Sequence, residues 1–182
     1  MTALLLLAAG RGTRFGGDKL AAPLDGRSLA QHAANNLAAL PFTRRIAVCS
    51  VQTPALPGFE RVLLDPSGAP LSRSISLGIA ALKGEQAVLI ALADMPLVPP
   101  SHFAALIAHF RGDRTGTRVG NLIMVPAIFG AAHFQALTAL SGDKGAGAML
   151  RDAPAVELEP SLALDVDTPE DLHRASALLQ GR

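Results

Sequence analysis

Short hydrophobic runs bounded by turn residues recur along the chain and predict β-strands at residues 3–9, 46–51, 62–64, 87–93, 122–125 and 162–166. Between these runs, hydrophobic residues recur at helical spacing, which predicts helices at residues 28–40, 74–82, 101–110, 131–140, 144–151 and 168–179. Strands that alternate with helices are typical of an α/β fold, in which crossover helices join a mainly parallel sheet. We therefore expect three layers, with helices covering both faces of the sheet.

Two other segments interrupt this alternation. Residues 53–58 contain two prolines and residues 112–120 are the most polar stretch, so both are predicted to be surface loops. The chain has no internal repeat and no linker long enough to divide it, so residues 1–182 are expected to form a single domain. Its 49% hydrophobic residues exclude a disordered chain.

The composition indicates which kinds of partner the protein does not bind. With 16 basic and 15 acidic residues and no Trp or Tyr, the chain lacks the basic face and stacking platforms of nucleic-acid binders. The first hydrophobic run, residues 3–9, is too short to span a bilayer or to act as a secretory signal. The lone Cys49 cannot form a disulfide within the chain and is interpreted as a core residue. We expect a cytoplasmic protein with neither a nucleic-acid nor a membrane partner.

The strongest local motif is the run LAAGRGTRFGGDK from Leu7 to Lys19, which follows the first predicted strand. Its glycines permit unusual dihedral angles and a close backbone approach, so that N–H groups can face a ligand; they are Gly10, Gly12, Gly16 and Gly17. Arg11, Arg14 and Lys19 add positive charge. The run predicts a binding site for the phosphates of a nucleotide, against the alternative of a glycine-rich turn with solvated cations.

Two familiar phosphate-binding motifs do not fit this run. A Rossmann dinucleotide turn needs G-x-G-x-x-G, but Phe15 occupies the place of its third glycine, and residues 50–53 offer no acid for a ribose. A P-loop needs a Gly-Lys pair followed by a hydroxyl, whereas Asp18 separates Gly17 from Lys19 and Leu20 follows. A nicotinamide or flavin redox protein is therefore disfavoured.

Carboxylates follow two of the predicted strands. Asp94 ends the run at residues 87–93, at the edge of a parallel sheet where ligands bind. Asp165 and Asp167 are two residues apart on the extended segment at the end of the last predicted strand and are expected to point to one side. Carboxylate oxygens suit Mg²⁺, which usually takes one or two of them together with substrate phosphates. Asp94 and Asp167 are the candidate metal ligands, and Asp165 could support them.

The acids beyond Asp167 fit a structural interpretation. Thr168 is a suitable N-cap and Pro169 suits the first position of a helix. Glu170 and Asp171 then complement the helix dipole in the first turn.

Together these motifs resemble those of the molybdenum-cofactor nucleotidyltransferases, a MobA-like group within the nucleoside-triphosphate transferases. The resemblance covers nearly the whole chain and rests on four runs: LAAGRGTRFGGDK at residues 7–19, DMP at 94–96, GDKGA at 142–146 and DVDTPEDL at 165–172. It implies a Rossmann-like sheet of the GT-A type, as in nucleotide-diphospho-sugar transferases. It also implies a Mg²⁺-dependent transfer of a nucleotide to a phosphorylated acceptor.

The resemblance assigns roles to individual residues. It places the triphosphate on Gly10, Gly12, Arg14 and Lys19, and the base on Leu7, Ala8, Ala9 and the serine-rich segment that contains Ser74. It makes Arg14, Lys19 and Asp94 catalytic and gives Mg²⁺ to Asp94 and Asp167. Because cytidylyl members tend to carry Ala-Ala-Gly where guanylyl members carry Ala-Gly-Gly, Ala9 favours CTP over GTP.

The half of the chain that would receive the acceptor departs from the family pattern. Gly120-Asn121-Leu122 stands where members that handle molybdopterin often have Gly-His-Pro or Gly-Asn-Pro, and Gly147 replaces a frequent arginine. Asn121 is still a candidate contact. For Asp143 two interpretations stand, a helix N-cap before Lys144 and an acceptor contact.

The expected reaction moves CMP from CTP to the phosphate of molybdopterin and releases pyrophosphate. A phosphomonoester has a second pKa of about 6 and is already anionic, so no protein base is required. Alternatives are a related transferase that uses GTP or another phosphorylated metabolite, and a non-catalytic nucleotide-binding protein that delivers the cofactor. A molybdenum hydroxylase is the candidate protein partner.

Overall fold

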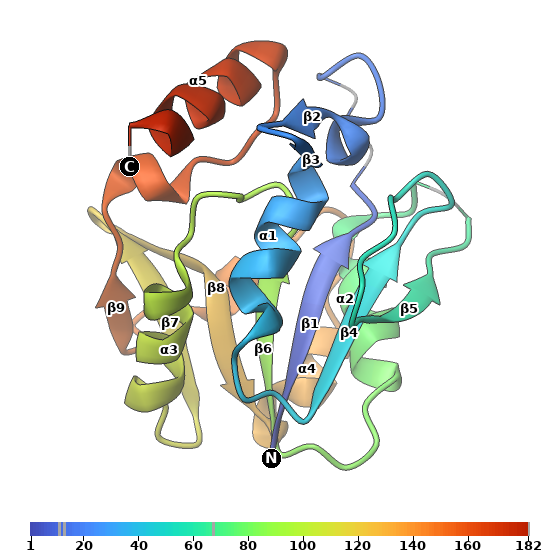
Figure 1. Cartoon of the computed structure of the whole chain (residues 1–182). Helices are drawn as coiled ribbons and strands as arrows, with labels where there is room; N and C mark the ends of the chain where they lie inside the picture. Colours follow the sequence, from blue (N-terminus) through green and yellow to red (C-terminus); the bar gives the residue numbers. More distant parts are fainter. Residues whose placement is uncertain (11, 13, 67, 182) are drawn as a thin grey trace.

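A computed structural model describes residues 1–10, 12, 14–66 and 68–181 of the chain (Figure 1). Within these residues seven strands form one sheet in the order β5-β4-β1-β6-β8-β7-β9. The strands are β1 (Thr2–Ala8), β4 (Arg44–Cys49), β5 (Glu60–Leu63), β6 (Ala87–Leu92), β7 (Arg114–Val119), β8 (Leu122–Gly130) and β9 (Ala155–Glu157). Strand β8 runs antiparallel to β6 and β7, and the other neighbouring strands pair in parallel. The prediction of a mainly parallel sheet is confirmed.

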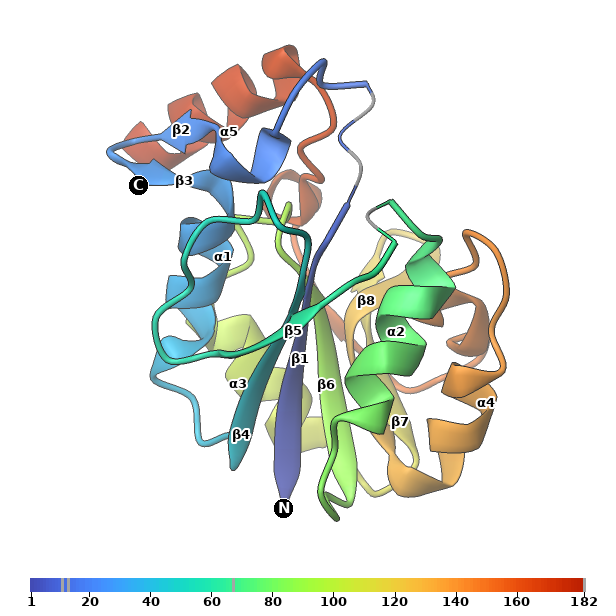
Figure 2. The same cartoon turned by 90° about the vertical axis from the view of Figure 1, so that its right-hand side faces the viewer.

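Helices lie on both faces of the sheet, which gives the expected three layers (Figure 2). On one side lie α1 (Leu29–Ala38) and α3 (Pro100–His109), and on the other lie α2 (Leu71–Ala80) and α4 (Phe134–Thr138). The last helix, α5 (Pro169–Gln180), packs with the core on the α1 side. Short 3₁₀ helices occur at η1 (Lys19–Ala21), η2 (Ala131–His133), η3 (Ala146–Met149) and η4 (Pro160–Ala163).

Strand β1 separates two hydrophobic cores because its side chains alternate between the faces of the sheet. Leu4 and Leu6 pack with the α1 side, whereas Leu5 and Leu7 pack with the α2 side. Helix α2 approaches β1 so closely that a Cβ atom at Gly78 would lie 2.3 Å from Leu5 Cδ1. This approach places the first turn of α2 beside the carboxyl end of β1.

A small hairpin of β2 (Pro23–Leu24) and β3 (Arg27–Ser28) lies against α5 (Figure 1). At its turn, Asp25 accepts hydrogen bonds from Ser176 Oγ at 3.0 Å and Gln180 Nε2 at 3.2 Å. Asp25 has a φ of 41°, in the left-handed region, and Gly26 follows it at 80°. The beginning and the end of the chain are joined at this point.

The structure corrects several predicted elements. Residues 162–166 are not a strand, because η4 and extended backbone without a ladder occupy them. Residues 112–120 are not a loop, because they contain β7, whose Thr115 and Thr117 are buried. The helix expected at 144–151 is only the 3₁₀ turn η3, and the one expected at 131–140 shrinks to η2 and α4. Strand β9 and the β2–β3 hairpin were not predicted. No helix among the described residues is long and apolar enough to cross a membrane.

Candidate active site

The glycine-rich run forms a tight turn at the carboxyl end of β1. The carbonyl oxygen of Gly12 accepts hydrogen bonds from the N–H groups of Phe15 at 3.0 Å and Gly16 at 3.2 Å. Gly12 has a φ of 56°, and a Cβ atom there would lie 2.7 Å from the Gly17 carbonyl oxygen. Position 12 therefore requires glycine for both backbone conformation and space. Arg11, which was expected to contribute charge, lies outside the described residues.

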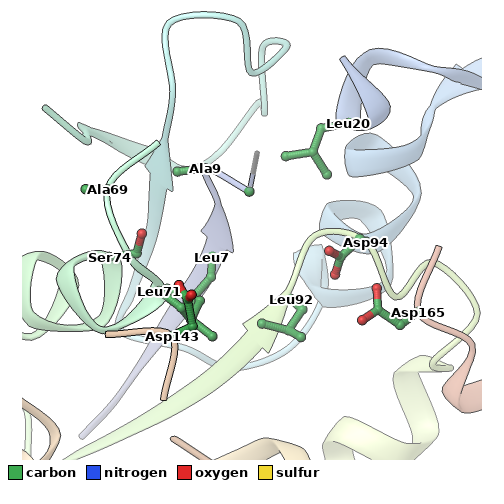
Figure 3. A pocket seen from close by; sticks show the side chains of 11 residues that line it. Leu7, Ala9, Leu20, Ala69, Leu71, Ser74, Leu92, Asp94, Asp143 and Asp165 are labelled. Carbon is green, nitrogen blue, oxygen red and sulfur yellow. The ribbon is translucent and has the colours of Figure 1, made fainter. Parts of the chain in front are cut away.

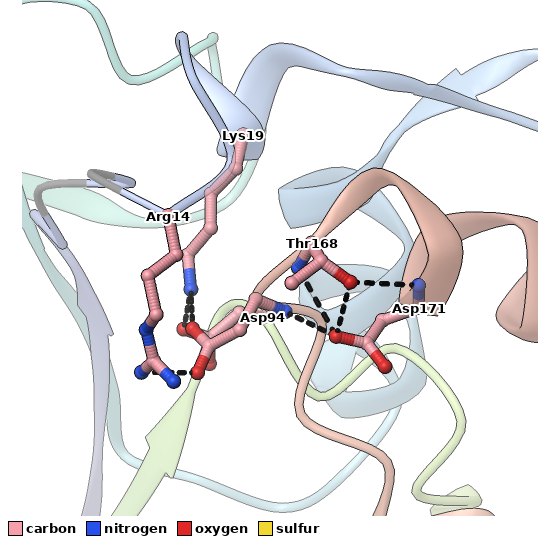
Figure 4. Close-up of polar contacts among 6 residues, drawn as sticks. Arg14, Lys19, Asp94, Thr168 and Asp171 are labelled. Carbon is pink, nitrogen blue, oxygen red and sulfur yellow. Dashed lines mark hydrogen bonds and ion pairs between the residues drawn. The ribbon is translucent and has the colours of Figure 1, made fainter.

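The turn ends at Lys19, whose ammonium group joins two carboxylates (Figure 4). Lys19 Nζ lies 2.8 Å from Asp94 Oδ2 and 2.9 Å from Asp167 Oδ1. Arg14 reaches the same acid from outside, with 2.5 Å between Arg14 Nη2 and Asp167 Oδ2. The Lys19 side chain is only 5% exposed, whereas that of Arg14 is 74% exposed. Lys19 is thus the buried centre of a four-residue charge network.

Local backbone contacts bring the two acids together. The N–H of Val166 donates to the carbonyl oxygen of Asp94 at 3.0 Å, which fixes the segment before α5 against the end of β6. Immediately after it, Thr168 and Asp171 form a capping box that starts α5. The structural interpretation of Thr168, Pro169 and the two following acids is confirmed by this helix start.

The charges in this network shift the pKa values of two groups. Burial lowers the pKa of Lys19, but the charge of Asp94 and hydrogen bonds to Asp94 and Asp167 outweigh it, so the pKa lies above 10.5. Burial and the neighbouring Asp94 carboxylate raise the pKa of Asp165 to about 7. Lys19 is therefore a permanent cation at neutral pH. Asp165 is a buried carboxyl group close to two other carboxylates, those of Asp94 and Asp167.

A pocket of about 280 Å³ opens beside this network (Figure 3). Leu7, Ala9 and Gly10 form one part of its wall and Ser74 another, while Asp94 and Asp165 lie near each other across the pocket. Its remaining lining residues are Leu20, Ala69, Leu71, Leu92 and Asp143. The pocket thus combines apolar walls with two neighbouring carboxylates, Asp94 and Asp165, and with a third, Asp143, that lies apart from them beside Leu71 (Figure 3).

The sequence-predicted residues separate into three groups. Those that line the pocket are Leu7, Ala9, Gly10, Ser74 and Asp94, and those that form the turn and charge network beside it are Gly12, Arg14, Lys19 and Asp167. Ala8 is buried, and its carbonyl oxygen accepts a 2.5 Å hydrogen bond from Thr53 Oγ1. Its side chain is therefore part of the core beneath the loop rather than of the pocket wall.

Asp165 and Asp167 face the same charge network, as expected. Asp167 pairs with Lys19 and Arg14, and Asp165 lines the pocket with Asp94 and interacts electrostatically with Lys19 and Asp167. Their segment is extended but is not part of the sheet. The N-cap interpretation of Asp143 is wrong, because η3 begins after Gly145 and Asp143 instead lines the pocket.

The sequence did not predict the apolar wall of the pocket or the hydrogen bond from Thr53 that supports the glycine-rich loop. Leu71 and Leu92 line the pocket, and only the register of α2 and β6 against β1 reveals this. Thr53 was assigned to a surface loop, yet it is 5% exposed and supports the start of the glycine-rich loop through Ala8. The single available signal was a hydroxyl residue directly after the second long strand.

The donor set fits a divalent cation that is shared with a substrate. Among the described residues, no group of three or more His, Cys, Asp or Glu side chains could hold a metal alone. Asp94 Oδ1 is nevertheless buried and has no hydrogen-bond partner in this part of the chain. Hard cations such as Mg²⁺ commonly take one or two carboxylates and complete their shell with phosphate oxygens and water. The free oxygen of Asp94 suits that arrangement.

A glycine-rich turn after β1, a buried lysine and a carboxylate after the neighbouring parallel strand β6 are typical of a nucleotide-binding α/β protein. Residues 4–159 match the model of the MobA-like NTP transferase domain, and the chain belongs to this family. It is therefore a nucleotidyltransferase whose substrates are small nucleotides and phosphorylated molecules. Comparison with curated proteins by sequence gives no match.

Solved structures share the fold along nearly the whole chain. The homolog of Mycobacterium tuberculosis Rv0371c from Mycobacterium sp. strain JC1 is 25% identical, with a TM-score of 0.87 over 100% of this chain and 98% of that one. Rv0371c from Mycobacterium tuberculosis H37Rv, in complex with manganese, is 22% identical, with a TM-score of 0.78 over 97% and 98%. The 2-C-methyl-D-erythritol 4-phosphate cytidylyltransferase from Thermus thermophilus is 18% identical, with a TM-score of 0.70 over 99% and 100%. The Rossmann-like three-layer fold is confirmed.

Proposed function

We propose that this nucleotidyltransferase transfers CMP from CTP to the phosphate of molybdopterin and releases pyrophosphate in a Mg²⁺-dependent reaction. The observation that carries the proposal is the position of Lys19, which joins Asp94 and Asp167 directly beneath the glycine-rich turn. A buried cation next to unpaired carboxylate oxygen provides charge of both signs, as a metal-bound triphosphate requires.

The nucleotide is proposed to bind in the pocket of about 280 Å³. Its base lies between the apolar side chains of Leu7 and Leu71, with the Ser74 hydroxyl available for a hydrogen bond. Its phosphates then extend to Gly10 and the N–H groups of the turn, where Arg14 and Lys19 neutralise their charge. In this arrangement the α-phosphorus lies near Asp94.

Transfer consists of an in-line attack by an oxygen of the acceptor phosphate on the α-phosphorus of CTP. A new P–O bond forms while the bond to the β-phosphate breaks, and pyrophosphate leaves with the electron pair. The attacking phosphate is already anionic at neutral pH, so the protein need not remove a proton. Lys19 and Arg14 hold the phosphates in place and balance the negative charge that gathers on the leaving group.

Asp94 and Asp167 are the proposed metal ligands, and Asp165 completes the acidic wall beside them. Mg²⁺ bound there would neutralise phosphate charge and polarise the α-phosphate. Because Lys19 contacts both ligands, its ammonium group keeps their oxygens oriented toward one point. The manganese complex of the Mycobacterium tuberculosis neighbour supports a divalent metal in this fold.

CTP is the proposed nucleotide because Ala9 lines the pocket and carries the methyl group typical of cytidylyl members. The Thermus thermophilus neighbour, a cytidylyltransferase of the same fold, supports this choice. Molybdopterin as acceptor and a molybdenum hydroxylase as recipient of the product rest on the family resemblance. A cytoplasmic location is part of the proposal, and the lone Cys49 of the sequence supports it.

A pyrophosphate-release assay tests the proposal. CTP, GTP and ATP are each offered with molybdopterin and with a sugar phosphate, with Mg²⁺ or with EDTA. We expect release only with CTP, molybdopterin and Mg²⁺ together. Release with GTP or with the sugar phosphate would replace the proposed substrate, and CTP binding without release under any condition would indicate a delivery protein.

A further inference from the structure

The carboxylate of Asp143 is separate from the other two carboxylates of the nucleotide pocket. Asp94 and Asp165 lie near each other in the wall, whereas Asp143 lies beside Leu71 (Figure 3). The Asp143 side chain forms no hydrogen bond and no ion pair with the described part of the chain. Both of its oxygens therefore keep their full capacity to accept hydrogen bonds from a molecule in the pocket.

The loop that carries Asp143 packs against the first turn of α2. The N–H of Ser72 donates to the carbonyl oxygen of Gly142 at 3.3 Å. A Cβ atom at Gly145 would lie 3.0 Å from Leu71 Cδ2, so the loop lies closely over this leucine. Gly142 has a φ of 61°, a left-handed conformation that turns the chain just before Asp143. Contacts on both sides of Asp143 thus hold it beside the start of α2.

The start of α2 is the part of the pocket that is proposed to receive the base. In that arrangement the base lies between Leu7 and Leu71, and the phosphates extend away from it to the glycine-rich turn. Ser74 is only 4% exposed, and its hydroxyl forms no hydrogen bond within the described residues, so this group is also available to a ligand. Asp143 and Ser74 therefore present a carboxylate and a hydroxyl to the polar edge of a base.

The sequence alone allows a contact between Asp143 and the acceptor, but the structure favours a contact with the nucleotide. Asp143 lines the nucleotide pocket. Gly147, which lies four residues further along the chain, lines a separate pocket together with Arg151. The two positions that follow α4 thus face different pockets, and only Asp143 faces the one that holds the base in the proposed arrangement.

We infer that Asp143 selects a base that carries an exocyclic amino group and so discriminates cytosine from uracil. The inference rests on the proposed function, because it takes the base to lie between Leu7 and Leu71. Protein carboxylates accept hydrogen bonds from the N4 amino group of cytosine. Uracil has a carbonyl oxygen at that position, and two acceptors that face each other form no hydrogen bond. A site that bonds to an N–H group of its substrate rejects an analogue that lacks this group.

Equilibrium binding of CTP and UTP tests this role of Asp143 without an acceptor. The Kd of each nucleotide is measured by isothermal titration calorimetry of the full-length protein in the presence of Mg²⁺. We expect the wild type to bind CTP about tenfold or more tightly than UTP. Asp143→Asn should bind UTP about tenfold more tightly than the wild type does, because an amide N–H can donate to the uracil carbonyl oxygen. Misfolding of the variant cannot produce such a gain.

Asp113→Asn is the matched control, because it alters an exposed aspartate that does not line the nucleotide pocket. It should keep the wild-type ratio of the two Kd values. Equal affinity of the wild type for CTP and UTP would overturn the inference. A wild-type ratio in Asp143→Asn would also overturn it, and is the result expected if Asp143 contacts only the acceptor. The proposed function fails on a different result, the absence of pyrophosphate release with molybdopterin, so the two failures are distinguishable.

Discussion

Lys19 Nζ and Asp94 Oδ2 lie 2.8 Å apart, and this contact joins the end of the glycine-rich turn to the end of β6. Both side chains are largely buried, so the pair is shielded from solvent. Breaking a buried pair by removing one partner leaves an uncompensated charge and is strongly destabilising. Loss of either side chain should therefore both destabilise the site and weaken its binding of phosphate.

Replacement of this lysine should affect catalysis more than nucleotide recognition. We expect Lys19→Met to lower kcat for pyrophosphate release at least about 100-fold, because a preorganised cation at the phosphates is lost. Lys83→Met, which alters a lysine elsewhere on the surface, is the matched control. Circular dichroism would show whether the variant is folded, and a folded Lys19→Met protein with normal kcat would contradict the role given to Lys19.

Asp94→Asn keeps the size of the side chain but removes its charge and one of its acceptor oxygens. We expect it to lose metal-dependent pyrophosphate release by about 100-fold or more, since a metal ligand and the partner of Lys19 disappear together. The measurement is a Mg²⁺ titration of the rate. Asp113→Asn, which alters an exposed acid beside β7, should leave the titration unchanged. A normal Mg²⁺ response in Asp94→Asn would remove Asp94 from the proposed metal site.

The glycine-rich turn offers a paired test within a few residues. Gly12→Ala introduces both a left-handed conformation at an L-residue, which costs about 1 to 2 kcal/mol, and a clash with the Gly17 carbonyl oxygen. Gly17→Ala meets nothing within 4 Å and has no positive φ. We expect the first variant to raise the KM for CTP several-fold and the second to be close to wild type. Equal effects in both variants would show that the turn conformation does not matter.

The buried His102 predicts how stability depends on pH. Burial lowers the pKa of its imidazole below 6.5, against a hydrogen bond with the Glu157 backbone that raises it. The unfolded chain therefore binds a proton first as the pH falls, so the stabilising contribution is present above pH 6.5 and is lost below it. Asp165, whose pKa is raised to about 7, acts in the opposite direction between about pH 7 and pH 5, so urea unfolding must isolate the His102 contribution by comparing wild type with a His102 variant.

Two histidine variants identify the source of that pH dependence. Between about pH 7 and pH 5 the unfolding free energy of His102→Gln should change in the stabilising direction relative to that of the wild type, because the destabilising protonation of His102 is removed. His109→Gln replaces an exposed histidine at the end of α3 and should follow the wild-type curve. Identical pH dependence in His102→Gln and the wild type would show that His102 does not contribute.

Local patterns predicted the long strands and helices because their hydrophobic periodicity is strong. They failed at β7, where Thr115 and Thr117 are polar yet buried. Thr117 Oγ1 donates to the Pro126 carbonyl oxygen at 2.6 Å and contacts His102 Nε2 at 2.8 Å, so its polarity is satisfied by distant residues. No short window of sequence reveals those partners.

At the site, the sequence predicted the residue types well but not all of their arrangement. The glycine-rich turn and Asp94 follow strands that are easy to recognise, and the positions of the side chains follow from parallel-sheet geometry. The way in which the segment of Asp165 and Asp167 is held could not be predicted, because the hydrogen bond from Val166 to Asp94 fixes it rather than a ladder. Long-range contacts of this kind leave no local periodicity.

The contact between the β2–β3 hairpin and α5 has a consequence for synthesis of the protein. Lys19 and the hairpin leave the ribosome before Asp167 and the α5 residues Ser176 and Gln180 that hold Asp25. A nascent chain can form β1, β4 and β6 before then, yet its lysine has only one of its two carboxylate partners. The charge network is therefore complete only after α5 has left the ribosome, so a nascent chain that still holds α5 inside the ribosome should lack transferase activity.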